Sequence, residues 1–229
     1  KFGQTVRARI VVDKLVAQIA GGAAMSFDFV VLALLAAILA GVGLASTNTV
    51  VIVASMLVSP IMGPVLAVTF GAFVADANLI LEGARSFLVG MATCVLAGLV
   101  IGFAMSPWAQ EEWAQWPNSE MYGRGQVSPG LLLGVCIAVP SGLGVALSVM
   151  GNNTSSLVGV AISASLLPPL VNAGICWAYA IAIETYLPKR LIPKTTAVEF
   201  VQLGGISIVL TLVNVACVFA TAIAMFRVK

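Results

Sequence analysis

Two stretches of sequence decide the fold of this chain: TNTVVIVASMLVSPIMGP at 47–64 and NTSSLVGVAISASLLPPLVN at 153–172. Both are apolar and rich in hydroxyl side chains, and both carry proline in their interior. Proline inside a helix removes a backbone hydrogen bond and clashes with the preceding turn. Interrupted hydrophobic segments at matching places in two halves of a membrane protein indicate a transporter's binding site. We therefore expect two broken helices that mark a functional centre.

The composition is that of a membrane protein. The 229 residues are 60% hydrophobic and 9% charged, with a mean hydropathy of +1.08, whereas soluble domains carry about 25% charged residues. No charged residue occurs in 29–75, 86–110, 125–183 or 200–226. Because a spanning helix needs about 20 apolar residues, the two longer runs accommodate two spans each and the shorter runs one each. The sequence predicts an all-α, multi-pass integral membrane protein with six transmembrane helices.

The predicted elements follow from these runs and from the polar segments between them. Residues 1–25 alternate basic and apolar positions and are expected to form an amphipathic helix at the membrane surface. Residues 26–105 would form a first transmembrane repeat, and residues 129–229 a second. Residues 106–128 are polar and rich in tryptophan, which favours headgroup level. They are expected to form an extracytoplasmic loop at the interface.

The two halves share a pattern of helix, tight turn, broken helix, charged loop and helix. A shift of 108 positions superposes Pro60 on Pro168 and Ser55 on Ser163. Since each half has an odd number of spans, the second is inverted relative to the first, which gives a 3+3 inverted repeat with second and fifth helices broken by proline. The alternative is that any six-span protein divides into two similar triples.

The distribution of lysine and arginine predicts the orientation, because cytoplasmic loops carry an excess of both. With the N-terminus in the cytoplasm, seven such residues lie inside and four outside. We therefore expect both termini to be cytoplasmic. The chain begins at Lys1 without Met, so it could be part of a longer protein.

The candidate pathway lies between the two broken helices. Breaks within a membrane are tolerated where they are buried in protein or line water, and half-helix ends add partial charges. A small polar solute or an ion is the expected substrate. The alternative is dry packing, since serine and threonine also bond neighbouring helices. The predicted lining residues are Asn48, Ser55, Ser59, Pro60, Gly63 and Pro64 with Ser163, Ser165, Pro168, Pro169 and Asn172.

Ionisable side chains lie only near the predicted helix ends. Asp76, Arg85 and Glu184 are candidate gate or mouth charges, with interfacial anchoring as the alternative. A proton relay built on a central carboxylate is disfavoured, because no ionisable residue lies in the middle of a predicted span.

Several other functions are disfavoured by what the sequence lacks. There is no histidine, and the four cysteines fall in four different predicted helices without metal spacing. We expect no catalytic activity, cofactor or metal, and the net charge of +2 without a basic cluster predicts no nucleic acid partner. Four-residue spacings of glycine at Gly98 and Gly102 and at Gly130 and Gly134 allow close helix approach. They suit packing within a protomer or in a homo-oligomer, which we expect among membrane lipids.

The proline motifs also resemble a known family. SPIMGP at 59–64, following TNT at 47–49, and LVGVAISASLLPP at 157–169 are similar to the two signatures of the hydrophobic membrane family catalogued as domain of unknown function 389. The resemblance runs from about Ser26 to the C-terminus. It implies a multi-span architecture, often preceded by a soluble region, and it names no substrate and no functional residue.

Two functions remain open from the sequence. The first is a transporter or channel for a small polar solute or ion, with its pathway between the broken helices. The second is a non-transporting membrane anchor, scaffold or sensor for a soluble region outside this chain. The first requires water at the proline breaks, and the second requires dry packing there.

Overall fold

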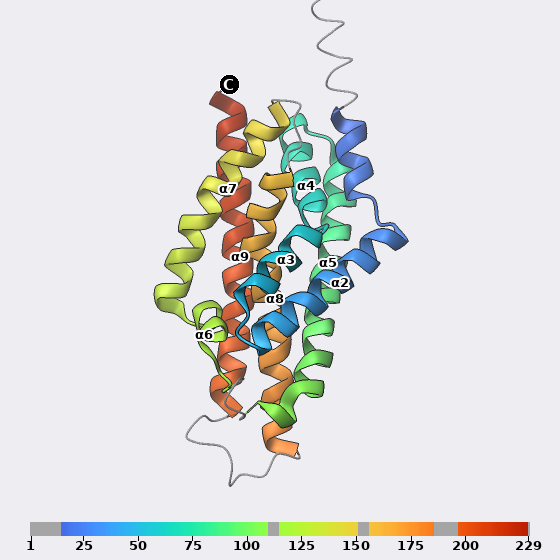
Figure 1. Cartoon of the computed structure of the whole chain (residues 1–229). Helices are drawn as coiled ribbons and strands as arrows, with labels where there is room; N and C mark the ends of the chain where they lie inside the picture. The colour runs from blue at the N-terminus through green and yellow to red at the C-terminus, as the bar shows by residue number, and fades with distance from the viewer. Residues whose placement is uncertain (1–14, 110–114, 151–155, 186–196, 229) are drawn as a thin grey trace, which may run out of the picture.

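The computed structural model describes residues 15–109, 115–150, 156–185 and 197–228, and it contains no strand in these ranges (Figure 1). A first helix covers residues 15–23. The elements that follow are α2 (Phe27–Ala45), α3 (Thr49–Val58), α4 (Met62–Val74), α5 (Ala77–Met105), a 3-10 turn (Ser106–Trp108), α6 (Ser119–Gly125), a π turn (Val127–Leu131), α7 (Leu132–Met150), α8 (Ser156–Thr185) and α9 (Ala197–Val228).

Several of these helices are long and apolar enough to cross a membrane. Four qualify individually, namely α2, α5 with its following turn, α8 from Ser165 onward, and α9. The pair α3 and α4 qualifies jointly as a fifth, and the two helices are bent by 53°. The remaining predicted span corresponds to α7, whose apolar part, Leu132–Leu147, is shorter. The chain is therefore an all-helical, multi-pass membrane protein with four or five candidate spans in the described ranges.

The predicted break in the first proline stretch is confirmed. Helix α3 stops at Ser59, whose backbone is extended at ψ 125°. Pro60 follows, and α4 begins at Met62 with Pro64 in its first turn. Proline is tolerated there because the first backbone N–H groups of a helix have no partner within it. The break is thus a local property of the sequence.

The predicted break in the second stretch is wrong, because α8 runs through Pro168 and Pro169 as one helix. In an α-helix the N–H of residue 169 would bond the carbonyl of Ser165, and proline has no N–H. The side chain of Asn214 on α9 takes this role, since its Nδ2 donates to the Ser165 carbonyl at 2.8 Å. A partner from another helix therefore allows α8 to continue.

Helix α8 is the centre of the bundle. Buried residues make up 89% of its membrane segment, against 28% for α5 and 33% for α9. It contacts α2, α3, α5, α7 and α9 (Figure 1). Glycines bring α5 closest, because a Cβ on Gly98 would stand 3.1 Å from the Cα of Gly174 and one on Gly102 would stand 2.9 Å from that of Ile175. The Gly98–Gly102 spacing thus serves packing within one chain.

The helix at 15–23 docks on the bend between α3 and α4. Leu15, Ile19 and Ala23 are buried, while Gly22 lies against Gly63, whose Cβ would strike the Gly22 carbonyl. The basic residues predicted to share this helix lie outside the described ranges. In Figure 1 this helix and the C-terminal end of α9 lie at the same end of the bundle.

Candidate functional site

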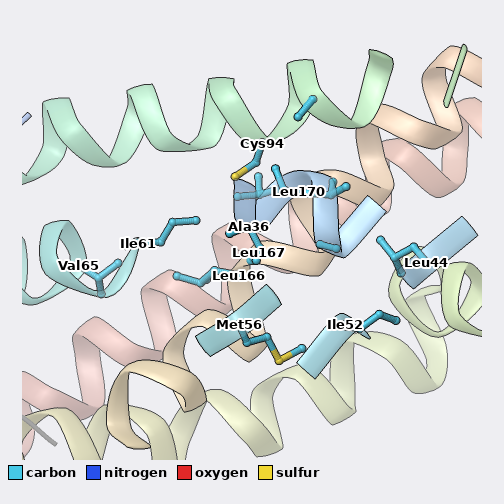
Figure 2. Close-up of a cluster of buried hydrophobic side chains, with 14 of the residues drawn as sticks. Ala36, Leu44, Ile52, Met56, Ile61, Val65, Cys94, Leu166, Leu167 and Leu170 are labelled. Carbon is cyan, nitrogen blue, oxygen red and sulfur yellow. The ribbon is translucent and has the colours of Figure 1, made fainter. Parts of the chain in front are cut away.

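The space between the bent helix pair and α8 is filled by apolar side chains. Figure 2 shows Ile52, Met56 and Ile61 of the first stretch and Leu167 and Leu170 of the second, which all belong to one cluster of buried side chains. Met56 is the most exposed of the five, at 9%. The two proline stretches thus contribute buried apolar side chains to one cluster, and we refer to these five residues as the apolar seam.

The polar residues of the first stretch bond mainly to their own segment. Ser55 is buried, and its Oγ donates to the Ile52 carbonyl at 2.6 Å. The Oδ1 of Asn48 caps α3 by accepting from the Val51 N–H. Ser59 and Pro60 line a separate pocket of about 330 Å³ together with Gly63 and residues of the first helix. The hydrogen bonds described for Asn48, Ser55 and Ser59 stay within residues 48–61, and Pro64 is buried within α4.

Among the described polar groups of the second stretch, the Asn172 side chain and the Ser165 carbonyl bond to α6 and α9. Asn172 is fully buried, and its Nδ2 donates to the Met121 carbonyl at 3.2 Å and to the Ser207 Oγ at 3.0 Å. The carbonyl of Ser165 accepts from Asn214. Ser163 belongs to α8, but its side chain lies outside the described part.

A buried polar stripe on α9 completes this network, and none of its residues is among those predicted from the sequence. Ser207, Thr211 and Asn214 are each at most 1% exposed. Their spacings of four and three residues place them on one helical face. The available signal was an asparagine in the charge-free run 200–226, preceded by two hydroxyls at helical spacing.

The segment before α6 enters the bundle, which differs from the predicted interfacial loop. Trp116 is buried, and its Nε1 donates to the Ala45 carbonyl at 3.1 Å. The Nδ2 of Asn118 donates to the Leu44 carbonyl at 2.7 Å. These carbonyls lie at the C-terminal end of α2, where helices leave their last carbonyls unpaired. The hydrogen bonds at this helix end thus place Trp116 inside the bundle, whereas Trp108 is 53% exposed.

A cavity of about 310 Å³ with both polar and apolar lining lies where α6, α7, α8 and α9 meet. Glu120 and Arg124 of α6 form an ion pair at one wall, and each side chain is about one-fifth exposed. The opposite wall contains Ser165, Pro169 and Asn214. The remaining lining residues are Ser119, Gly123, Gly130, Leu133, Gly134, Ile137 and Leu210. Of the predicted pathway residues, only Ser165 and Pro169 line this cavity.

Asn214 is the least satisfied polar residue of this cavity. Its Nδ2 bonds the Ser165 carbonyl, but its Oδ1 is buried without a hydrogen-bond partner. The same oxygen lies beside Gly134 of α7, where a Cβ would stand 2.9 Å away. Buried polar atoms are almost always hydrogen-bonded in native structures. An unpaired acceptor in a cavity wall is therefore a candidate contact for a bound solute.

The three predicted gate charges lie elsewhere. Asp76 caps α5, and its Oδ1 accepts from the N–H groups of Asn78 and Leu79 at 3.0 and 3.3 Å. Arg85 lines a pocket of about 420 Å³ beside Glu82 and the first turns of α5. Glu184 is exposed near the end of α8 and lines an apolar groove. The structure does not bring them together with the 310 Å³ cavity.

One titratable group beside this region has a shifted pKa. Burial, and then the hydrogen bond to the Glu199 carboxylate at 2.9 Å, raise the pKa of the Tyr122 phenol above its ordinary value. The phenol therefore stays protonated and ties α6 to the start of α9. Within the ranges that the structure covers, no group of three His, Cys, Asp or Glu side chains is placed to hold a metal.

Comparisons with known proteins show which family the chain is similar to. The family described as "Domain of unknown function (DUF389)" matches residues 56–220. "Uncharacterized protein MJ0678" of Methanocaldococcus jannaschii is 24% identical over 151 residues, which cover 66% of this chain and 44% of that protein. The chain therefore spans less than half the length of this relative. No solved structure matches the chain.

Proposed function

The chain belongs to the DUF389 family of membrane proteins, and we propose that it is the membrane part of a transporter or channel for a small polar solute or ion. The observation that carries this proposal is the unpaired Asn214 Oδ1 in the cavity beside the proline pair of α8. The Nδ2 of Asn214 has a structural role at the Ser165 carbonyl, but its Oδ1 is left over, and an unsatisfied buried acceptor costs about 1–3 kcal/mol. A solute that pairs with this acceptor would remove the cost.

We propose that six spans form two inverted repeats, with α7 as the fourth span. The first repeat contains α2, the bent pair α3–α4, and α5, and the second contains α7, α8 and α9. Within each proposed repeat, every span packs against the other two when α3 and α4 are counted as a single span. The contact of α5 with α8 has a weaker counterpart between α9 and α4. The repeats then differ chiefly in that α8 is unbent, as expected if they adopt different states during transport.

The transport path would lead from the cavity past Pro169 and across the apolar seam. The seam closes the path between the proline stretches, so its opening is the conformational step we assign to transport. Asp76, Arg85 and Glu184 remain candidate charges at the mouths, at the helix ends where they lie. Cytoplasmic termini and a homo-oligomer complete the proposal, and no catalytic step is included.

The second candidate is a membrane anchor, scaffold or sensor for a soluble region. The apolar seam favours it, because a dry contact between the two halves suits a permanently packed core. The two candidates differ in whether water reaches the α9 side of α8.

Thiol labelling separates these candidates. In a background without the four native cysteines, Ser165→Cys and Leu167→Cys place probes two residues apart on α8. Only Ser165 lines the cavity. We expect a membrane-impermeant maleimide to label Ser165→Cys from one side and to leave Leu167→Cys unlabelled. If Ser165→Cys stays protected from both sides while Thr47→Cys, in the exposed turn between α2 and α3, is labelled, the site is dry and the scaffold function replaces the transporter.

A further inference from the structure

We infer that the 310 Å³ cavity binds a small solute without net charge that donates an N–H or O–H hydrogen bond to the Oδ1 of Asn214. This inference rests on the proposed function and specifies the substrate class of the same site. It is carried by the orientation of one amide, by the balance of charge in the wall and by the size of the cavity.

The orientation of the Asn214 amide follows from its partner. The atom it contacts at 2.8 Å is the carbonyl oxygen of Ser165, which can only accept. The nitrogen of the amide must therefore face Ser165, and the oxygen must face the other way. That oxygen lies beside Gly134, and both Asn214 and Gly134 line the cavity. Only a donor can satisfy it, because an amide oxygen has acceptor capacity alone.

The charge of the wall is balanced. Glu120 and Arg124 are the ionisable residues among its described lining, and they pair with each other. Arg124 also donates to the Glu120 carbonyl at 2.8 Å, and Glu120 accepts from Thr49 Oγ1 at 3.3 Å. A solute ion would enter a site with no uncompensated opposite charge, and desolvation of an unpaired ion is costly. A solute without net charge avoids this cost, and a zwitterion can align with the pair.

The size and lining of the cavity limit the solute. About 310 Å³ is at the lower end of the range of roughly 300–1,000 Å³ for ligand pockets. Leu133, Ile137 and Leu210 contribute apolar surface, while three glycines expose backbone. The cavity therefore suits a solute of a few heavy atoms with both polar and apolar faces.

Flux through proteoliposomes tests this inference. Purified protein is reconstituted, and solute entry is followed by light scattering after an osmotic step with glycine, erythritol or trimethylamine N-oxide. Glycine and erythritol donate hydrogen bonds, whereas trimethylamine N-oxide is equally neutral overall and has no donor. We expect entry of glycine, erythritol or both to exceed protein-free vesicles, and no protein-dependent entry of trimethylamine N-oxide. Equal entry of all three solutes would overturn the requirement for a donor.

A variant pair isolates the Asn214 oxygen. Pro169→Ala restores an N–H that can bond the Ser165 carbonyl, so Asn214→Leu in this background leaves that carbonyl paired. We expect flux of the donor solute to fall about tenfold from Pro169→Ala to the double variant, which corresponds to about 1.4 kcal/mol. If Pro169→Ala is itself inactive, Asn214→Leu alone is compared with the unmodified chain, after a single size-exclusion peak verifies folding. Unchanged flux would overturn the inference. Thr93→Val, remote on α5, is the control.

Measurements of ion flux distinguish a failure of the inferred substrate class from a failure of the proposed function. Protein-dependent sodium or chloride flux without flux of the neutral donors would overturn the substrate class and leave a transporter or channel. Absence of flux for every solute and ion, in vesicles that contain folded protein, would overturn the proposed function and the inference with it.

Discussion

At the scale of single residues, Asn214 and Pro169 form one unit although 45 positions separate them in the sequence. Proline takes a donor away from the Ser165 carbonyl, and the asparagine side chain supplies one from a neighbouring helix. Membrane helices tolerate internal prolines where neighbours satisfy the freed backbone groups in this way. The Oδ1 of the same Asn214 amide has no hydrogen-bond partner and belongs to a residue that lines the cavity.

This pairing predicts a rescue between two substitutions. Asn214→Ala should lower the free energy of unfolding by about 1–3 kcal/mol, because it removes the hydrogen bond from Asn214 to the buried Ser165 carbonyl. Adding Pro169→Ala should recover much of that loss, since the new N–H can bond Ser165. Unfolding in detergent with increasing denaturant, followed by helical circular dichroism, measures both effects.

The matched control for this pair of substitutions is Pro168→Ala, which restores an N–H one position earlier, toward the carbonyl of Ala164. It should not rescue Asn214→Ala. Additive effects of Pro169→Ala and Asn214→Ala would contradict the assignment of the asparagine as the partner of the freed carbonyl.

At the scale of helices, glycine decides which elements touch. Helix α5 approaches α8 through Gly98, Gly102 and Gly174, and their missing side chains allow backbone contact. Helix α7 approaches α9 in the same way, because a Cβ on Gly142 would stand 3.0 Å from the Cα of Val218. In lipid, where apolar burial between helices brings little, such close packing is a main source of association.

Gly98→Ala should therefore be destabilising although alanine favours helices. Its methyl group would strike the carbonyl of Val171 and stand 3.1 Å from the Cα of Gly174, so α5 and α8 must separate. We expect a loss of about 1–3 kcal/mol, as for other overpacked sites. Gly205→Ala on α9, with no atom within 4 Å of its Cβ position, is the control. Equal unfolding midpoints for the two variants would show that α5 is held by other contacts.

At the scale of the whole molecule, the connecting segments hold the two halves together. The segment before α6 caps α2 through Trp116 and Asn118, and Thr49 at the start of α3 contacts Glu120 of α6. The helix at 15–23 lies on the bend of α3 and α4 through Gly22 and Gly63. A movement of the first helix would thus act directly on the bent span.

The docking of the first helix is testable by hydrogen exchange. Gly63→Ala would place a methyl group against the Gly22 carbonyl, so the helix at 15–23 must shift away. We expect its amides to exchange at least several-fold faster, measured by mass spectrometry in detergent or nanodiscs. Gly21→Ala is the control, because no atom lies within 4 Å of its Cβ position. Unchanged exchange in Gly63→Ala would mean that the helix is held without this contact.

Local chemistry was predictable from the sequence alone. The charge-free runs identify a multi-pass helical membrane protein, and Pro60 with Pro64 predicts the break between α3 and α4. Both follow from short-range physics, since spanning length and the missing proline N–H depend on neighbouring residues only. The family resemblance was also predictable, and it is confirmed over residues 56–220.

Only the tertiary structure decided what depends on partners distant in the sequence. The same proline chemistry breaks one span and leaves α8 continuous, because Asn214 supplies the donor that Pro169 lacks. Trp116 lies inside the bundle because the end of α2 needs a donor. Of the predicted lining residues, only Ser165 and Pro169 lie in the wall of the 310 Å³ cavity, whereas Ser59, Pro60 and Gly63 line a separate pocket. A sequence specifies which groups lack a partner, and the packing of helices determines which distant side chain satisfies them.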